Sequence, residues 1–133
     1  MKRVTGIGGI FFKAQDPKSL KEWYKAHLGV DAGDYGATFD WRDKDDPNKS
    51  GQTVWSLFPH DTKYFDPSSA PFMINYRVED LVGLQAVLRS EGVEVSDVQD
   101  DGYGRFAWAS DPEGNRIELW EPAEEQSDST SES

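Results

Sequence analysis

The sequence predicts a single α+β domain in which two similar βαβββ modules form one curved, half-barrel mixed sheet with the helices on its outer face. Three observations carry this prediction. The chain has 133 residues, the same order of elements occurs twice, and each helical stretch begins at a capping aspartate and ends near a glycine. One module cannot bury its own sheet, so the two are expected to pack side by side around a concave cavity.

The first module is expected over about residues 1–62. Its helix is capped by Asp16, ends at Gly29 and carries an apolar stripe made of Leu20, Trp23, Tyr24 and Leu28. Strands are expected over residues 7–13, 37–42 and 53–58.

The second module is expected over about residues 70–121, after a connector that is rich in proline and serine. Its helix is capped by Asp80, leaves through Gly92 and carries Leu81, Leu84, Val87 and Leu88. Strands are expected over residues 72–78, 105–110 and 116–121, the last two joined by a turn over residues 111–115 in which Gly114 and Asn115 tolerate positive φ. Residues 122–133 are expected to be a disordered acidic tail, so the domain covers residues 1–121.

Charge and composition exclude several classes of partner and chemistry. The net charge is -11, which repels nucleic acid and anionic membrane surfaces. The chain has no cysteine, so disulfides, thiolate zinc sites and a cysteine nucleophile are excluded. The first residues lack the apolar block of a signal peptide, and we therefore expect a cytoplasmic protein.

The stretch Asp-Pro-Glu-Gly-Asn-Arg-Ile-Glu-Leu-Trp at residues 111–120 is the most specific motif. Together with the duplication and the helix from Asp16 to Gly29, it resembles the vicinal oxygen chelate (VOC) superfamily of glyoxalases, bleomycin resistance proteins and dioxygenases. The resemblance implies a homodimer and one divalent metal on the concave face. The metal ligands would be a His that opens each module and a Glu in the last strand.

Aligned on the two capping aspartates, the His positions of this resemblance fall at Gly9 and Met73, whereas the Glu position is kept as Glu118. A fourth, carboxylate ligand would fall near Trp55. Only two histidines occur in the chain, so a conventional site with two imidazoles and a carboxylate is not expected. No cofactor is predicted from the residues, and a divalent metal is implied by the resemblance alone.

Strand alternation sets the expected lining of the cavity. If Glu118 points inward, Arg116 and Trp120 share its face, and Asn75 and Arg77 lie on the same face of the strand over 72–78. Arg77, Arg116 or both are expected to pair with Glu118 and replace part of the charge of a metal. The alternative is that they are solvated charges near strand ends.

Trp55 and Trp120 are the aromatic residues most strongly expected to contact a ligand, although such residues more often fill a core. His60 could act as a general base with Asp61 beside it in sequence. An exposed loop histidine is favoured instead, because no nucleophile motif accompanies it.

Three function classes remain open, because the superfamily includes both enzymes and binding proteins. The first choice is a small-molecule-binding protein without the usual metal centre. The second is an enzyme of the lyase or dioxygenase type whose diverged site uses Glu118 as acid or base. The third is a non-catalytic scaffold whose cavity is filled by its own side chains.

Overall fold

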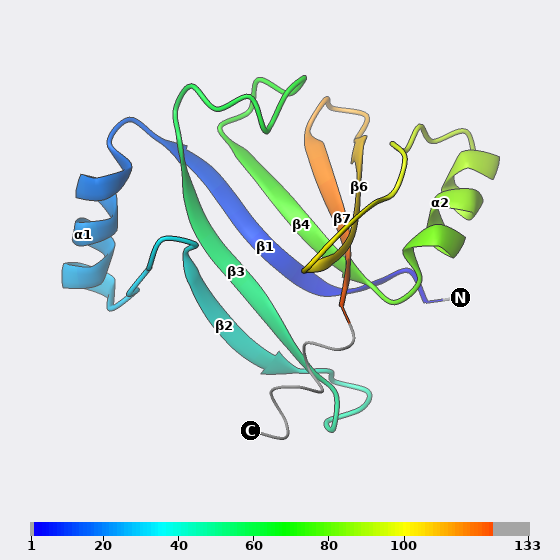
Figure 1. Ribbon diagram of the computed structural model, residues 1–133, viewed down its shortest axis with the longest axis horizontal. Coiled ribbons are helices and arrows are strands. Elements are labelled where there is room, and N and C mark those ends of the chain that lie inside the picture. The colour runs from blue at the N-terminus through cyan, green and yellow to red at the C-terminus, as the bar shows by residue number, and fades with distance from the viewer. Residues whose placement is uncertain (1, 124–133) are drawn as a thin grey trace.

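A computed structural model describes residues 2–123 and confirms the α+β architecture. Within these residues, two helices flank one curved sheet with the strand order β2-β3-β1-β4-β7-β6-β5 (Figure 1). The expected acidic tail from residue 124 onward lies outside the described residues. The elements are β1 (Val4–Ala14), α1 (Pro17–Leu28), β2 (Ala37–Arg42), β3 (Ser50–Pro59), β4 (Phe72–Val78), α2 (Leu81–Ser90), β5 (Gln99–Asp101), β6 (Gly104–Ser110) and β7 (Arg116–Pro122).

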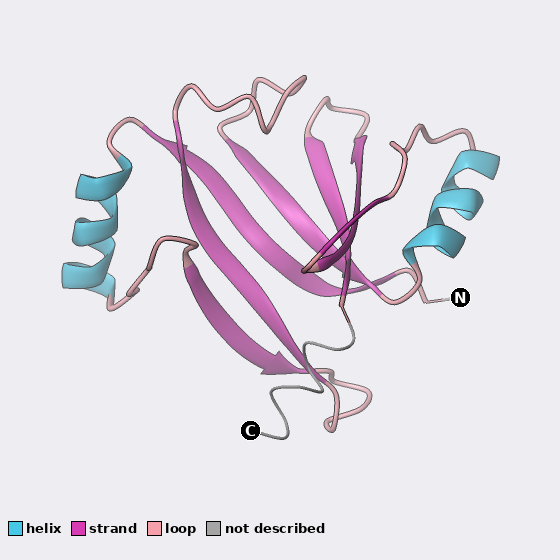
Figure 2. Ribbon diagram, in the orientation of Figure 1, coloured by secondary structure: helices cyan, strands magenta, loops and turns pink. Residues whose placement is uncertain are grey.

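The two halves of the chain meet at the centre of the sheet, where β1 pairs antiparallel with β4. Each of these central strands also has a parallel partner from its own half, β3 for β1 and β7 for β4. The sheet is therefore mixed, as expected. Helix α1 packs against β1 and β3, and α2 packs against β6 and β7 (Figure 2).

The first half departs from the expected βαβββ pattern, because it contributes three strands where the pattern has four. Between α1 and β2 the described chain forms only an isolated bridge between Gly33 and Gly36. Gly29 and Gly36 have φ values of 71° and 102°, a conformation that extended strands do not use. The second half has four strands, including the three-residue β5, whose Gln-Asp-Asp sequence gave no strand signal.

Both helices begin where the sequence predicts. The Asp16 side chain accepts a hydrogen bond from Ser19 N at 3.2 Å, and that of Asp80 accepts one from Gly83 N at 3.0 Å. Gly29 closes α1 in the left-handed conformation. None of the described helices is long and apolar enough to cross a membrane.

The main core lies between α2 and the sheet. Leu81 and Leu84 of the helix are buried against Leu119 of β7, with Tyr76 and Ile117 packed around them. These strand residues all fall on the helix-covered outer face, as alternation predicted. The opposite, inner face is therefore the one that carries Asn75 and Glu118.

Candidate functional site

Glu118 of β7 is almost completely buried, with 2 % of its surface exposed. Its Oε1 accepts a hydrogen bond from Asn75 Nδ2 at 2.6 Å. Its Oε2 accepts from Trp108 Nε1 at 2.8 Å and from the Tyr64 hydroxyl. Three protein donors thus satisfy both oxygens, which is what burial of a carboxyl group requires.

The sheet register brings these donors together. Asn75 on β4 and Trp108 on β6 are the direct neighbours of Glu118 in the strands on either side. Tyr64 comes from the connector between β3 and β4, where its ring stacks on Phe58 with 5.7 Å between ring centroids. The connector therefore closes over the inner face at Glu118.

Tyr64 is held in its neutral form. Burial, followed by the charge of Glu118 and the hydrogen bond to it, raises the pKa of the Tyr64 hydroxyl. The hydroxyl consequently remains a donor to Glu118 at neutral pH. No local pattern indicates this contact, because Tyr64 lies in a loop 54 residues away from Glu118.

The metal site implied by the resemblance does not fit the residues at this place. Gly9, Asn75 and Glu118 lie in one row across β1, β4 and β7, whereas Met73 is buried opposite Phe11. Asn75, not Met73, is therefore the β4 residue beside Glu118. The donor set is one carboxylate, an amide, an indole and a phenol. Within residues 2–123 no group of three or more histidine, cysteine or carboxylate side chains is placed to hold a metal ion.

The expected pairing of arginine with Glu118 is wrong for the described residues. The Arg116 guanidinium donates to Asp66 O and lies 5.2 Å from the Trp108 ring centroid. The Arg77 guanidinium lies over two indoles, 5.5 Å from the ring centroid of Trp41 and 5.1 Å from that of Trp120. Both Glu118 oxygens accept hydrogen bonds from other donors, and the two arginines lie over aromatic rings instead.

Arg77 belongs to a continuous line of aromatic rings and one guanidinium group. We call it the stacked row, and it consists of Trp108, Phe106, Trp120, Arg77 and Trp41. The Phe106 and Trp120 rings are nearly parallel, with 5.9 Å between centroids and 7° between planes. The Trp120 indole also donates to Tyr103 O at 2.9 Å. The row thus crosses the inner face from the Glu118 site toward β2.

Glycines form the floor under Trp41. A Cβ atom added at Gly6 or at Gly51 would lie 2.4 Å from Trp41 Cη2, so the indole rests directly on the backbone of β1 and β3. Its Nε1 donates to Thr53 Oγ1 at 2.9 Å. Sequence reasoning missed Trp41, although two glycines facing it across neighbouring strands were the available signal.

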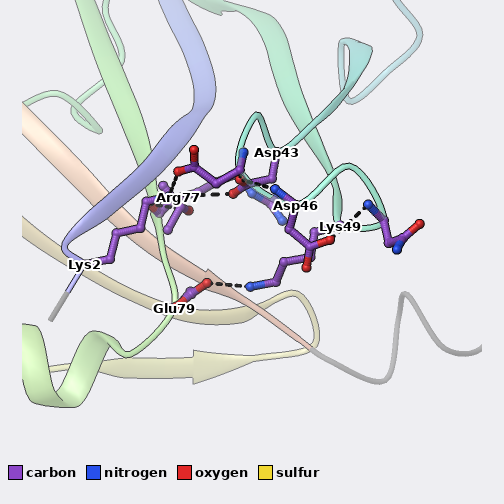
Figure 3. Close-up of polar contacts among 9 residues, drawn as sticks. Lys2, Asp43, Asp46, Lys49, Arg77 and Glu79 are labelled. Atoms are coloured by element: carbon purple, nitrogen blue, oxygen red, sulfur yellow. Dashed lines mark hydrogen bonds and ion pairs between the residues drawn. The ribbon is translucent and has the colours of Figure 1, made fainter.

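An open depression of about 1020 Å³ lies at the Trp41 end of the stacked row. Trp41, Arg77 and Trp120 line it, and its rim carries charged residues that include Asp43, Lys49, Glu79 and Glu121. Figure 3 shows ion pairs and hydrogen bonds on this rim, with Arg77 nearby. Burial lowers the pKa of Arg77 by disfavouring its charged form, and no carboxylate among the described residues pairs with it.

Two other predicted site residues, Trp55 and His60, lie away from both Glu118 and the depression beside Arg77. Trp55 faces α1, where its ring is 4.8 Å from that of Tyr24 and 5.5 Å from that of Phe12, so the expected position in the cavity is wrong. Neighbouring residues of a strand alternate faces, and Ser56 and Val54 take the inner face instead. His60 is exposed in the turn that follows β3.

Comparison with known proteins gives the family. A family model described as a glyoxalase-like domain matches residues 9–120. Methylmalonyl-CoA epimerase from Mycobacterium tuberculosis has 24% identity and a TM-score of 0.60, with 96% of this chain and 95% of that chain covered. Streptomyces coelicolor methylmalonyl-CoA epimerase in complex with 2-nitronate-propionyl-CoA has 21% identity and a TM-score of 0.65, with 90% and 99% covered.

Other structures of this shape carry different names. One is described as an NAD-dependent benzaldehyde dehydrogenase from Legionella pneumophila, with 12% identity, a TM-score of 0.55, and coverage of 86% of this chain and 98% of that chain. No curated protein sequence matches the chain significantly. At these identities the likeness concerns the fold, so it does not select an activity. The family model nevertheless covers most of the sequence, and the chain belongs to the glyoxalase-like domain family.

Proposed function

We propose that this protein binds a small molecule in the depression beside Arg77 and that this binding needs no metal at Glu118. One observation carries the proposal. Both oxygens of the buried Glu118 already accept hydrogen bonds from the protein, whereas Arg77 borders an open depression of about 1020 Å³. Small-molecule sites are concave and combine apolar walls with a few polar groups, as this depression does.

The same observation weighs against the catalytic alternative. A general acid or base must reach the atom that it protonates or deprotonates, directly or through one water molecule. Glu118 is almost completely buried, and Tyr64, Asn75 and Trp108 already donate to both of its oxygens. The inner face near Glu118 is filled in the way the scaffold alternative requires, but the end of the face near Trp41 is open.

Nuclear magnetic resonance of the 15.0 kDa protein tests the binding proposal, because each of the five tryptophans supplies one indole N–H signal. The probes are three naphthalene compounds that differ only in a carboxylate, carboxamide or methylammonium substituent. At least one should shift the signals of Trp41 and Trp120 saturably. Trp23, half exposed on α1, is the control and should not follow them. No selective shift with any of the three would overturn the proposal.

Metal dependence is tested on the same protein, purified without a metal-binding tag. The proposal expects unchanged probe binding after incubation with nickel, zinc, iron or manganese and after removal of metal with a chelator. Stoichiometric metal that is lost in Glu118→Gln, together with binding that needs the metal, would contradict it.

A further inference from the structure

Arg77 is a half-buried cation whose surroundings leave one kind of contact available. Its guanidinium carbon lies over two indole rings, 5.5 Å from the ring centroid of Trp41 and 5.1 Å from that of Trp120. A guanidinium has five N–H donors, all in its plane. Within the described residues no carboxylate lies within ion-pair distance of Arg77, so these in-plane donors are available to a ligand.

We infer that the ligand of this depression carries a carboxylate group, which Arg77 binds through two parallel N–H···O hydrogen bonds. This inference rests on the proposed function, because it names the chemistry of the molecule bound at the same place. A planar carboxylate matches the planar guanidinium fork, and such paired bonds are stronger and more directional than bonds between neutral groups.

The acidic residues around the depression do not neutralise Arg77, because they have partners of their own. Glu79 pairs with Lys49 at 2.7 Å. Asp43 lies 3.9 Å from Lys2, and its Oδ1 accepts from Asp45 N at 2.8 Å (Figure 3).

The two remaining carboxylates of the lining, Glu121 and Asp40, also do not pair with Arg77. Glu121 accepts a hydrogen bond from Leu81 N at 3.0 Å and lies 3.8 Å from Arg105. Asp40 adjoins Trp41 in β2, and alternation places its side chain on the other face of the sheet. Arg77 is thus a locally unpaired cation even though the whole chain carries a net charge of -11.

The same carboxylates select the charge of the ligand. The cationic partners of Asp43, Glu79 and Glu121 reduce the negative charge of the rim but do not remove it, so a phosphate dianion meets more repulsion there than a carboxylate monoanion does. Burial of Arg77 without an anion is unfavourable, which the lowered pKa of Arg77 reflects, and a carboxylate would offset that cost. Neutral and cationic ligands would leave the buried charge of Arg77 without a compensating anion.

The three naphthalene probes also test this inference, with dissociation constants measured by calorimetry and confirmed on the Trp41 and Trp120 indole signals. The carboxylate should bind at least about tenfold more tightly than the carboxamide, which corresponds to one charge-assisted contact. Inorganic phosphate should not compete at equal concentration. In Arg77→Gln the advantage of the carboxylate should vanish, and Arg77→Lys should restore only part of it, because lysine lacks the fork.

Arg89→Gln is the matched control, since it removes one positive charge from helix α2, outside the lining of this depression. It should leave the preference for the carboxylate unchanged. Equal or tighter binding of the carboxamide, the ammonium compound or phosphate at the same two indoles would overturn the carboxylate inference and leave the proposed function standing. If no probe shifts these indoles, both proposals fail.

Discussion

The surroundings of Glu118 determine what its carboxyl group can do. The residue keeps the position that the VOC resemblance assigns to a metal ligand, but its oxygens point at Asn75, Trp108 and Tyr64. In this chain, Glu118 links β4, β6 and the connector. Its role in the described structure is to hold the inner face together.

Replacing Glu118 by glutamine tests this role. One oxygen becomes an NH2 group that faces an N–H of Asn75 or of Trp108, so a buried donor loses its acceptor. The free energy of unfolding should fall by about 1–3 kcal/mol. Urea denaturation measures the change, with Glu113→Gln in the exposed hairpin turn as the control. Equal stability of the two variants would show that the carboxyl group is not structural.

Tyr64 should make the protein sensitive to alkali. Burial and the neighbouring Glu118 raise the pKa of its hydroxyl above the ordinary 10.0. The unfolded chain therefore loses this proton first, and the stabilisation is complete below about pH 10 and declines above it. Between pH 8 and pH 11 the unfolding free energy should fall more steeply in the wild type than in Tyr64→Phe. Parallel pH curves for the two proteins would contradict this assignment.

At the scale of elements, the β6–β7 hairpin depends on Asp111. Its side chain accepts from Glu113 N and Asn115 N, both at 2.9 Å, and from Asn115 Nδ2 at 3.0 Å. The hydrogen bond from the Asn115 side chain is the largest cause that lowers the pKa of Asp111, followed by those from the backbone. This turn positions β7 and with it Glu118.

Asp111 should therefore contribute to loss of stability in acid. A carboxyl group whose pKa is lowered by folding stabilises the fold above its unfolded pKa, and this contribution disappears as the pH falls through the lower folded value. Circular dichroism during urea unfolding at pH 6 and at pH 2.5 should show a smaller acid loss in Asp111→Asn than in the wild type. The same loss in both proteins would mean that the turn is not acid-sensitive.

The position of Trp41 depends on the glycines of two neighbouring strands. In Gly51→Ala the new methyl group would lie 2.4 Å from Trp41 Cη2, so the indole must shift from its present place 5.5 Å from the Arg77 guanidinium. The unfolding free energy should fall by about 1–3 kcal/mol, as for other overpacked sites, and the Trp41 indole signal should shift. Gly33→Ala, which places its methyl group in open space, is the control. Similar effects of both substitutions would count against this packing.

At the scale of the whole molecule, the sheet is open, with β2 and β5 at its edges within the described residues. The side of β2 that carries Phe39 leaves this ring half exposed. Unpaired strand edges readily add another strand, and the VOC resemblance implies dimers. Sedimentation analysis should give twice the chain mass of 15.0 kDa. A single species at 15.0 kDa across micromolar concentrations would exclude a homodimer.

Much of this fold was predictable because its signals are local. Asp16 and Asp80 cap their helices through bonds to residues three positions ahead, and the Asp111–Asn115 turn is set by the five residues that form it. Alternation placed Ile117 and Leu119 on the outer face, and the structure confirms it. The duplication indicated how the halves combine, since each alone leaves a sheet uncovered.

The site depended on contacts that no local pattern encodes. The parallel register of β4 with β7 places Asn75, not Met73, beside Glu118. Trp55 faces the helix because the register of β3 against β1 fixes its side, and register is a property of two strands. The sequence by itself determined the family, the order of elements and the surviving Glu118. Only the tertiary structure decided that Tyr64 and its neighbours occupy that carboxyl group and that Arg77 remains unpaired beside Trp41, because those partners are distant in the chain and meet only through packing.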